Sequence, residues 1–74
     1  MSKLPVVSGK ETVKALSKIG YLFDHQRGSH IVLRQQVSPF RRVTVPDHKE
    51  IAKGTLRTII REVGLSVEEF TKLL

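Results

Sequence analysis

A histidine near the middle of the chain is the side chain best suited to chemistry. His30 follows Gly28 and Ser29, and it lies between two short apolar segments at residues 21–23 and 31–33. This context predicts a hairpin that presents the histidine at the start of its second strand. Because the unperturbed pKa of histidine is about 6.5, such a side chain can accept and donate protons near neutral pH. Proton transfer on an exposed surface is therefore the chemistry that this stretch suggests.

The charge distribution indicates what kind of molecule would meet that histidine. The chain of 74 residues contains 13 lysines and arginines against 7 aspartates and glutamates, which gives a net charge of +6. Between Arg27 and Arg61 there are eight basic residues and two acidic ones, so this segment carries all of the net charge. Such a segment favours a polyanionic partner, either a nucleic acid or an acidic protein. The alternative is a solvated charged face that keeps a small protein in solution.

Composition argues against several other kinds of site. The chain has no cysteine, which excludes disulfides and thiolate metal ligands. Its three histidines form no helical His-x-x-x-His pair, so we expect neither a metal nor a small-molecule cofactor. No apolar run approaches the roughly 20 residues of a membrane span. Residues 1–5 lack the apolar core of a signal peptide, so a cytoplasmic protein without membrane contact is expected.

Three short segments between the helical parts of the chain have the composition of strands. The predicted strands cover residues 21–24, 30–34 and 41–45, and residues 25–29 form the turn between the first two. Pro46 ends the third strand, because proline has no N–H to donate to a ladder. The histidine therefore starts the central strand.

Strand alternation predicts which side chains share a face. His30 and Arg34 fall on one face of the central strand, while Ile31 and Leu33 fall on the other. If the apolar face carries the helices, the histidine and the arginine face solvent together. The alternation leaves open which face of the first strand is buried.

Two capping boxes predict where helices begin. In each of them a serine and a glutamate three residues later bond each other's backbone N–H groups. Ser8 with Glu11 opens a first helix over residues 9–19, and Ser66 with Glu69 opens a short terminal helix.

A second long helix is predicted before the terminal one. Thr55 is its expected N-cap, and Gly64 stops it. Its apolar stripe consists of Leu56, Ile59, Ile60 and Val63. The element order is then α-β-β-β-α-α. It fits an α+β fold in which helices pack on one face of a three-stranded antiparallel sheet, as a single domain over residues 1–74.

Several short sequence motifs, taken in their order along the chain, resemble those of the HicA family of small toxins from type II toxin–antitoxin systems. The resemblance covers nearly the whole chain. It rests on residues 19–21, 26–30, 42–46, 48, 54–57 and 64–70. It implies a fold like that of double-stranded-RNA-binding domains, mRNA interferase activity and neutralisation by a HicB-type antitoxin. One departure is visible, because residues 36–40 replace the short Asp-Gly-type turn that is frequent in the family.

The resemblance makes His30 the catalytic histidine. RNA cleavage needs a base for the 2′-hydroxyl proton, an acid for the leaving 5′ oxygen, and cationic or N–H groups for the charged intermediate state. His30 could act as base or acid, and Arg27 or Arg34 could stabilise charge. The alternative is a hairpin histidine that only supports the turn or stacks on RNA. His48 is a second candidate acid or base, or simply an exposed loop side chain.

Further residues are candidates for holding RNA. Gly28 and Ser29 could bring backbone N–H groups and a hydroxyl close to a phosphate, although they could equally serve the turn alone. Resemblance to double-stranded-RNA-binding domains suggests phosphate contacts for Lys49 and Lys53, which otherwise belong to a solvated loop. The competing hypotheses are a non-catalytic RNA-binding module and a basic adaptor for an acidic protein.

Overall fold

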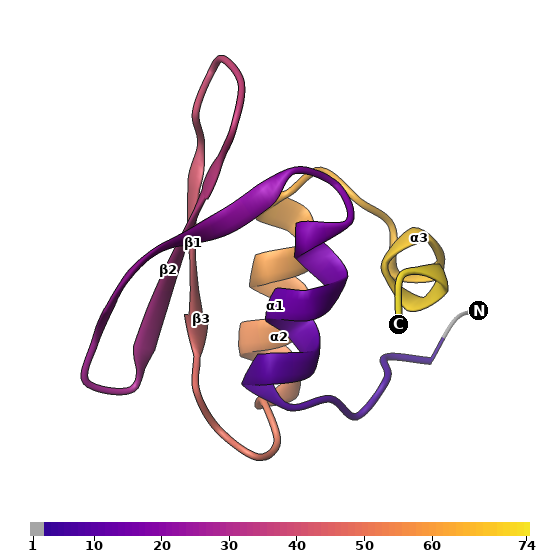
Figure 1. The fold of residues 1–74 in the computed structure, drawn as a ribbon. Coiled ribbons are helices and arrows are strands. Elements are labelled where there is room, and N and C mark those ends of the chain that lie inside the picture. Colours follow the sequence, from indigo (N-terminus) through magenta and orange to yellow (C-terminus); the bar gives the residue numbers. More distant parts are fainter. Residues whose placement is uncertain (1–2) are drawn as a thin grey trace.

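The fold is a curved sheet with helices on one side only, as the computed structural model of the chain shows for residues 3–74 (Figure 1). The first two residues of the predicted domain lie outside this described part. In chain order the elements are α1 (Gly9–Ser17), β1 (Tyr21–Arg27), β2 (His30–Gln35), β3 (Arg42–Pro46), α2 (Lys53–Glu62) and α3 (Val67–Lys72). The predicted α+β class and the order α-β-β-β-α-α are confirmed.

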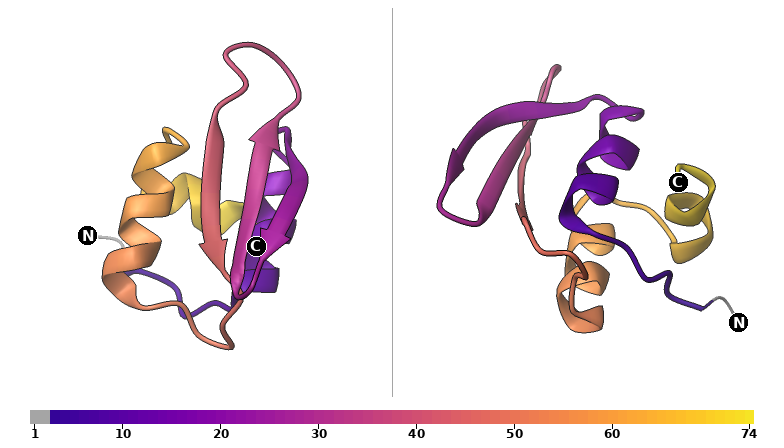
Figure 2. Two further views of the ribbon diagram at one scale, coloured as in Figure 1. Left: turned by 90° about the vertical axis from the view of Figure 1, so that its left-hand side faces the viewer. Right: turned by 60° about the horizontal axis from the view of Figure 1, so that its bottom comes forward.

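The sheet is antiparallel, with β2 between β1 and β3. Seen face-on, the three strands lie in front of the helices, and nothing in the described chain covers their outer face (Figure 2). We call this outer face the open face. The helices α1 and α2 lie side by side behind the sheet, and α3 lies beyond them (Figures 1 and 2).

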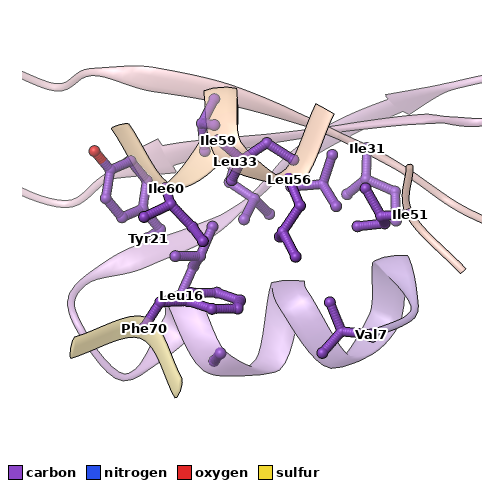
Figure 3. Packing of buried hydrophobic residues seen from close by; sticks show 13 residues of the cluster. Val7, Leu16, Tyr21, Ile31, Leu33, Ile51, Leu56, Ile59, Ile60 and Phe70 are labelled. Atoms are coloured by element: carbon purple, nitrogen blue, oxygen red, sulfur yellow. The ribbon is translucent and has the colours of Figure 1, made fainter. Parts of the chain in front are cut away.

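The core lies between the sheet and the helices. Ile31 and Leu33 of β2 point into it with Leu16 of α1 and Phe70 of α3, and all four side chains are buried (Figure 3). Tyr21 is buried in the same cluster. The open question about β1 is therefore answered at its first residue, which faces the helices.

Both predicted capping boxes are present. Ser8 accepts from the backbone N–H of Glu11, whose carboxylate accepts from the N–H of Ser8, and Ser66 and Glu69 repeat the pattern. The first helix is two residues shorter than predicted, because it ends at Ser17 and a turn follows. Helix ends are set by local hydrogen bonds, which the apolar spacing does not report.

The predicted N-cap of the second long helix was wrong. Helix α2 begins at Lys53 with Ala52 as its N-cap, and Thr55 lies inside the first turn. The reason is tertiary, since the N–H of the buried Ile51 donates to the carbonyl of Val7 at 2.9 Å. This bond fixes the chain just before Ala52, whose carbonyl accepts the first helical bond.

Four strand boundaries also differ from the prediction, two of them by one residue at the ends that face the 36–41 loop. Strand β1 continues to Arg27 rather than ending at Asp24, and the turn shrinks to two residues, 28 and 29. An irregularity in the pairing with β2, between Phe23 and His25, makes the longer strand possible. Strand β3 includes Pro46, which stands opposite His30 in the register and needs no N–H there.

Candidate active site

His30 is exposed on the open face, at the first position of β2. Ile31 and Leu33 of the same strand point the other way, into the core. The predicted alternation along this strand is therefore confirmed. Across the sheet, Arg27 of β1 and Pro46 of β3 stand directly opposite the histidine. Its imidazole thus has an arginine as its cross-strand neighbour.

The turn that precedes the histidine is tightly held. Gly28 has a φ of +58°, in the left-handed region that glycine adopts at low cost. The backbone N–H of Asp47 donates to the carbonyl of Ser29 at 2.6 Å. The side-chain amide of Gln26 donates to the carbonyl of Gly28 at 3.0 Å. The Asp47 bond joins the turn to the segment after β3, and the Gln26 bond holds the hairpin itself, so together they fix where His30 begins its strand.

The same end of the sheet is joined to α1. The N–H of Gly9 donates to the carbonyl of His48 at 2.8 Å. A side chain at Gly9 would collide with the carbonyl oxygen of Pro46. Only glycine therefore lets the helix start this close to the end of β3. Sequence reasoning missed this role, although a glycine directly after a capping serine is its signal.

Arg34 lies at the other end of the open face. It is four residues beyond His30 on β2, which places it roughly 13 Å away along the strand. Its cross-strand neighbours are Leu22 on β1 and Arg42 on β3. The structure thus brings Arg27, Gly28, Ser29 and His30 together and separates Arg34 from them.

The two predicted lysines lie in the segment that leads from β3 to α2 rather than on the open face. Both side chains are exposed, Lys49 in the loop after β3 and Lys53 as the first residue of α2. This loop and the 28–29 turn lie at the same end of the molecule (Figure 1). His48 stands in the loop as well. Its side chain is exposed, and its backbone carbonyl is what holds Gly9.

Comparison with known proteins gives the family. A family model described as the HicA toxin of bacterial toxin–antitoxin systems matches residues 9–65, from the start of α1 to just beyond α2. The chain belongs to the HicA toxin family. The family resemblance and the predicted membership of a toxin–antitoxin system are therefore confirmed.

One solved structure supports the assignment. It is a chain of a toxin–antitoxin complex from Streptococcus pneumoniae, 35% identical in sequence, with a TM-score of 0.69. The match covers 80% of this chain and 98% of that one. No curated protein matches.

The HicA chain has a β-bulge in β1, which was not predicted from the sequence. Simple alternation would put Tyr21, Phe23 and His25 on one face. The pairing instead skips Asp24, so that Phe23 stands opposite Leu33 and His25 stands opposite Val32. This bulge turns His25 to the open face, away from the core side where Tyr21 is buried.

Asp24 and His25 form a hydrogen-bonded pair at the bulge. Oδ2 of the aspartate lies 2.8 Å from Nδ1 of the histidine. This bond, followed by the nearby Arg34 and Arg42 guanidinium groups, holds the pKa of Asp24 below its usual value despite partial desolvation. The carboxylate is therefore ionised at neutral pH.

The far end of the HicA sheet carries exposed apolar side chains. Leu22 and Phe40 are 44% and 53% exposed, and with Arg34 they line a shallow hollow of about 180 Å³. Among residues 3–74 no cluster of three metal-ligating side chains occurs. None of the helices in that range has the length and apolar character needed to span a bilayer.

Proposed function

We propose that this HicA-family protein is an mRNA interferase that cleaves RNA without a metal, with His30 as a proton-transfer residue. The observation that carries the proposal is the position of that side chain. It is exposed, it starts a strand whose position is fixed by backbone bonds at the turn, and it faces Arg27 across the sheet. An mRNA substrate also implies a cytoplasmic site of action.

The chemistry needs little from the protein beyond these groups. A base removes the proton of the 2′-hydroxyl, the 2′ oxygen attacks the adjacent phosphorus, and the 5′ oxygen leaves with a proton from an acid. His30 takes one of the two proton-transfer roles. Arg27 stabilises the negative charge that develops on the phosphate oxygens.

The remaining predicted residues would hold the RNA backbone. Gly28 and Ser29 present exposed backbone at the turn, where a phosphate can approach closely. Lys49 and Lys53 add positive charge in the segment between β3 and α2, which is bonded to the turn through Asp47. Arg34 would meet RNA that continues along the open face, at a distance from the cleaved bond.

We further propose that a HicB-type antitoxin neutralises the toxin. The structural neighbour comes from a toxin–antitoxin complex, and a chain of net charge +6 favours an acidic partner. An antitoxin seated on the turn end would cover His30 and the cationic groups around it.

A non-catalytic RNA-binding module is the second candidate function. It is favoured by the open setting of His30, which lies on an exposed strand and lines none of three hollows found on the described surface. A binding module needs no enclosed site, whereas many catalysts exclude water from theirs.

The decisive experiment incubates the purified protein with a labelled mRNA in EDTA, beside His30→Ala protein whose folding is checked by circular dichroism. We expect cleavage by the parent alone. Binding without cleavage by either protein would support the binding module. Equal cleavage by both would refute the role of His30 and direct attention to other histidines.

A further inference from the structure

Two histidines share the open face of the sheet. His25 stands opposite Val32 in the register, and Val32 lies two residues beyond His30 on β2. The two histidines are therefore diagonal neighbours on adjacent strands. The Cα atoms of such neighbours lie about 7–8 Å apart, within reach of aromatic side chains. One phosphodiester group fits between two imidazoles at this spacing, hydrogen-bonded to both.

The two histidines differ in how their rings are oriented. Asp24 lies 2.8 Å from Nδ1 of His25, so the Nδ1–H group donates to the carboxylate and Nε2 remains available to a substrate. The His25 side chain is 52% exposed, which leaves that nitrogen room to meet one. A carboxylate bonded to one nitrogen also stabilises the ring when it carries a proton.

The charged groups around His25 suit a phosphate. On its own strand it has Asp24 beside it and Arg27 two residues further on, and on β2 it has His30 as its diagonal neighbour. Arg34 of β2 and Arg42 of β3 lie near enough to Asp24 to lower the pKa of that carboxyl. Asp24 is the acid among them, and it is already bonded to the histidine. Arg27 is left to contact the cleaved phosphate, and Arg34 and Arg42 to contact RNA that continues along the open face.

We propose that His25 is the second proton-transfer residue of the ribonuclease, the acid that complements His30 as the base, and that Asp24 is its positioning residue. This rests on the proposed RNA cleavage. His30 removes the proton of the 2′-hydroxyl as the bond from the 2′ oxygen to phosphorus forms. The bond from phosphorus to the 5′ oxygen breaks, and His25 gives that oxygen its proton. The products are a 2′,3′-cyclic phosphate and a 5′-hydroxyl.

His25 is better placed for this role than His48. His48 follows the end of β3, in the loop that leads to α2, and its backbone carbonyl rather than its ring makes the anchoring bond. His25 lies on the same face as His30 and has a carboxylate partner that orients it.

The test compares ordinary RNA with RNA in which sulfur replaces the leaving 5′ oxygen at the main cleavage site mapped with the parent protein. A thiolate leaves without protonation, so the sulfur substrate does not need the acid. We expect His25→Ala to slow cleavage of ordinary RNA by about 100-fold or more and to cleave the sulfur substrate at close to the parent rate. His30→Ala should be slow on both substrates.

A second variant tests Asp24 without removing either histidine. Asp24→Asn loses the carboxylate that orients the ring, so cleavage of ordinary RNA should slow while the sulfur substrate, which needs no acid, is cleaved at close to the parent rate. Glu62→Gln is the matched control, an exposed carboxylate at the end of α2 behind the sheet, and it should leave both rates unchanged. Circular dichroism and a His25→Gln variant separate loss of the acid from loss of folding.

The outcomes that contradict the proposal are distinct. His25→Ala protein that cleaves ordinary RNA at the parent rate overturns the role of His25 and leaves the proposed function standing. Equal slowing on both substrates overturns its assignment as the acid. A parent protein that does not cleave ordinary RNA overturns the proposed function, and this inference with it.

Discussion

The two ends of the open face are built in different ways. At the turn end, two residues join β1 to β2, and backbone bonds link the turn to Asp47 and the adjoining loop to α1. At the loop end, residues 36–41 join β2 to β3 and expose Val37 and Phe40. The loop end has a backbone bond as well, from the N–H of Gln36 to the carbonyl of Gly20 at 3.1 Å, but its connection is longer and exposes apolar side chains. The candidate chemistry lies at the end with the short connection. The comparison teaches that a shallow site in a small protein is positioned by the backbone around it, not by an enclosing pocket.

The largest expected contrast is in activity. His30→Ala, at the turn end, should slow RNA cleavage by roughly 10²–10⁴-fold, the range for loss of a proton-transfer group. Val37→Ser, at the loop end, should leave the rate within about twofold, because that side chain is 68% exposed and far along the hairpin. Single-turnover cleavage of a labelled mRNA measures both. Comparable losses in the two variants would remove the functional distinction between the ends.

The next contrast is in stability. Gly9→Ala should lower the free energy of unfolding by about 1–3 kcal/mol or more, because the new methyl group collides with the backbone of Pro46. Gly54→Ala is the matched control. It lies inside α2 with no atom near its added Cβ, so alanine should raise stability by up to about 1 kcal/mol. Urea unfolding measures both values, and a harmless Gly9→Ala would contradict the close junction.

A smaller contrast in stability compares two residues with left-handed backbone conformation, one at each end of the open face. Gly28 has a φ of +58° and Phe40 a φ of +57°. Gly28→Ala should cost about 1–2 kcal/mol, because a side chain is strained in this region. Phe40→Gly should change stability by under about 1 kcal/mol, since relief of that strain offsets the greater freedom of glycine in the unfolded chain. The shift in melting temperature gives the sign of each effect.

The smallest effect is a pH dependence at the bulge. The folded-state pKa of Asp24 lies below its unfolded value, so the carboxylate contributes stability above the unfolded pKa of about 3.9. That contribution disappears as the pH falls through the folded pKa. The melting temperature of the parent should therefore fall more steeply below about pH 4 than that of Asp24→Asn. Identical slopes would show that the bond to His25 does not favour the ionised carboxylate.

Sequence patterns predicted the parts of the fold that depend on local chemistry. Both capping boxes and the alternation along β2 were correct, because each rests on residues a few positions apart. The N-cap at Thr55 was wrong because a bond between Ile51 and Val7, 44 positions apart, decides where α2 begins. Rules that consider only neighbouring residues cannot predict a contact between such distant positions.

The candidate site, too, was predicted only in part. Residues 27–30 were chosen from the sequence and do lie together at the turn. His25 was assigned no role, because it was predicted to lie in the turn after the first strand. The strand instead continues past a bulge at Asp24 that puts His25 on the open face, and nothing in the composition of β1 predicts that bulge. The roles of all these residues remain predictions for the experiments above.

The bulge at Asp24 has a consequence for how this chain meets other chains. Strand β1 forms one border of the sheet, and its outer row of N–H and C=O groups is available to a strand from another molecule. The extra residue interrupts that row and twists the border, so a foreign strand cannot pair along its whole length. The opposite border, β3, has only five residues and ends in a proline. The bulge that places His25 on the open face thus also makes this border of the sheet a poor template for pairing with a foreign strand.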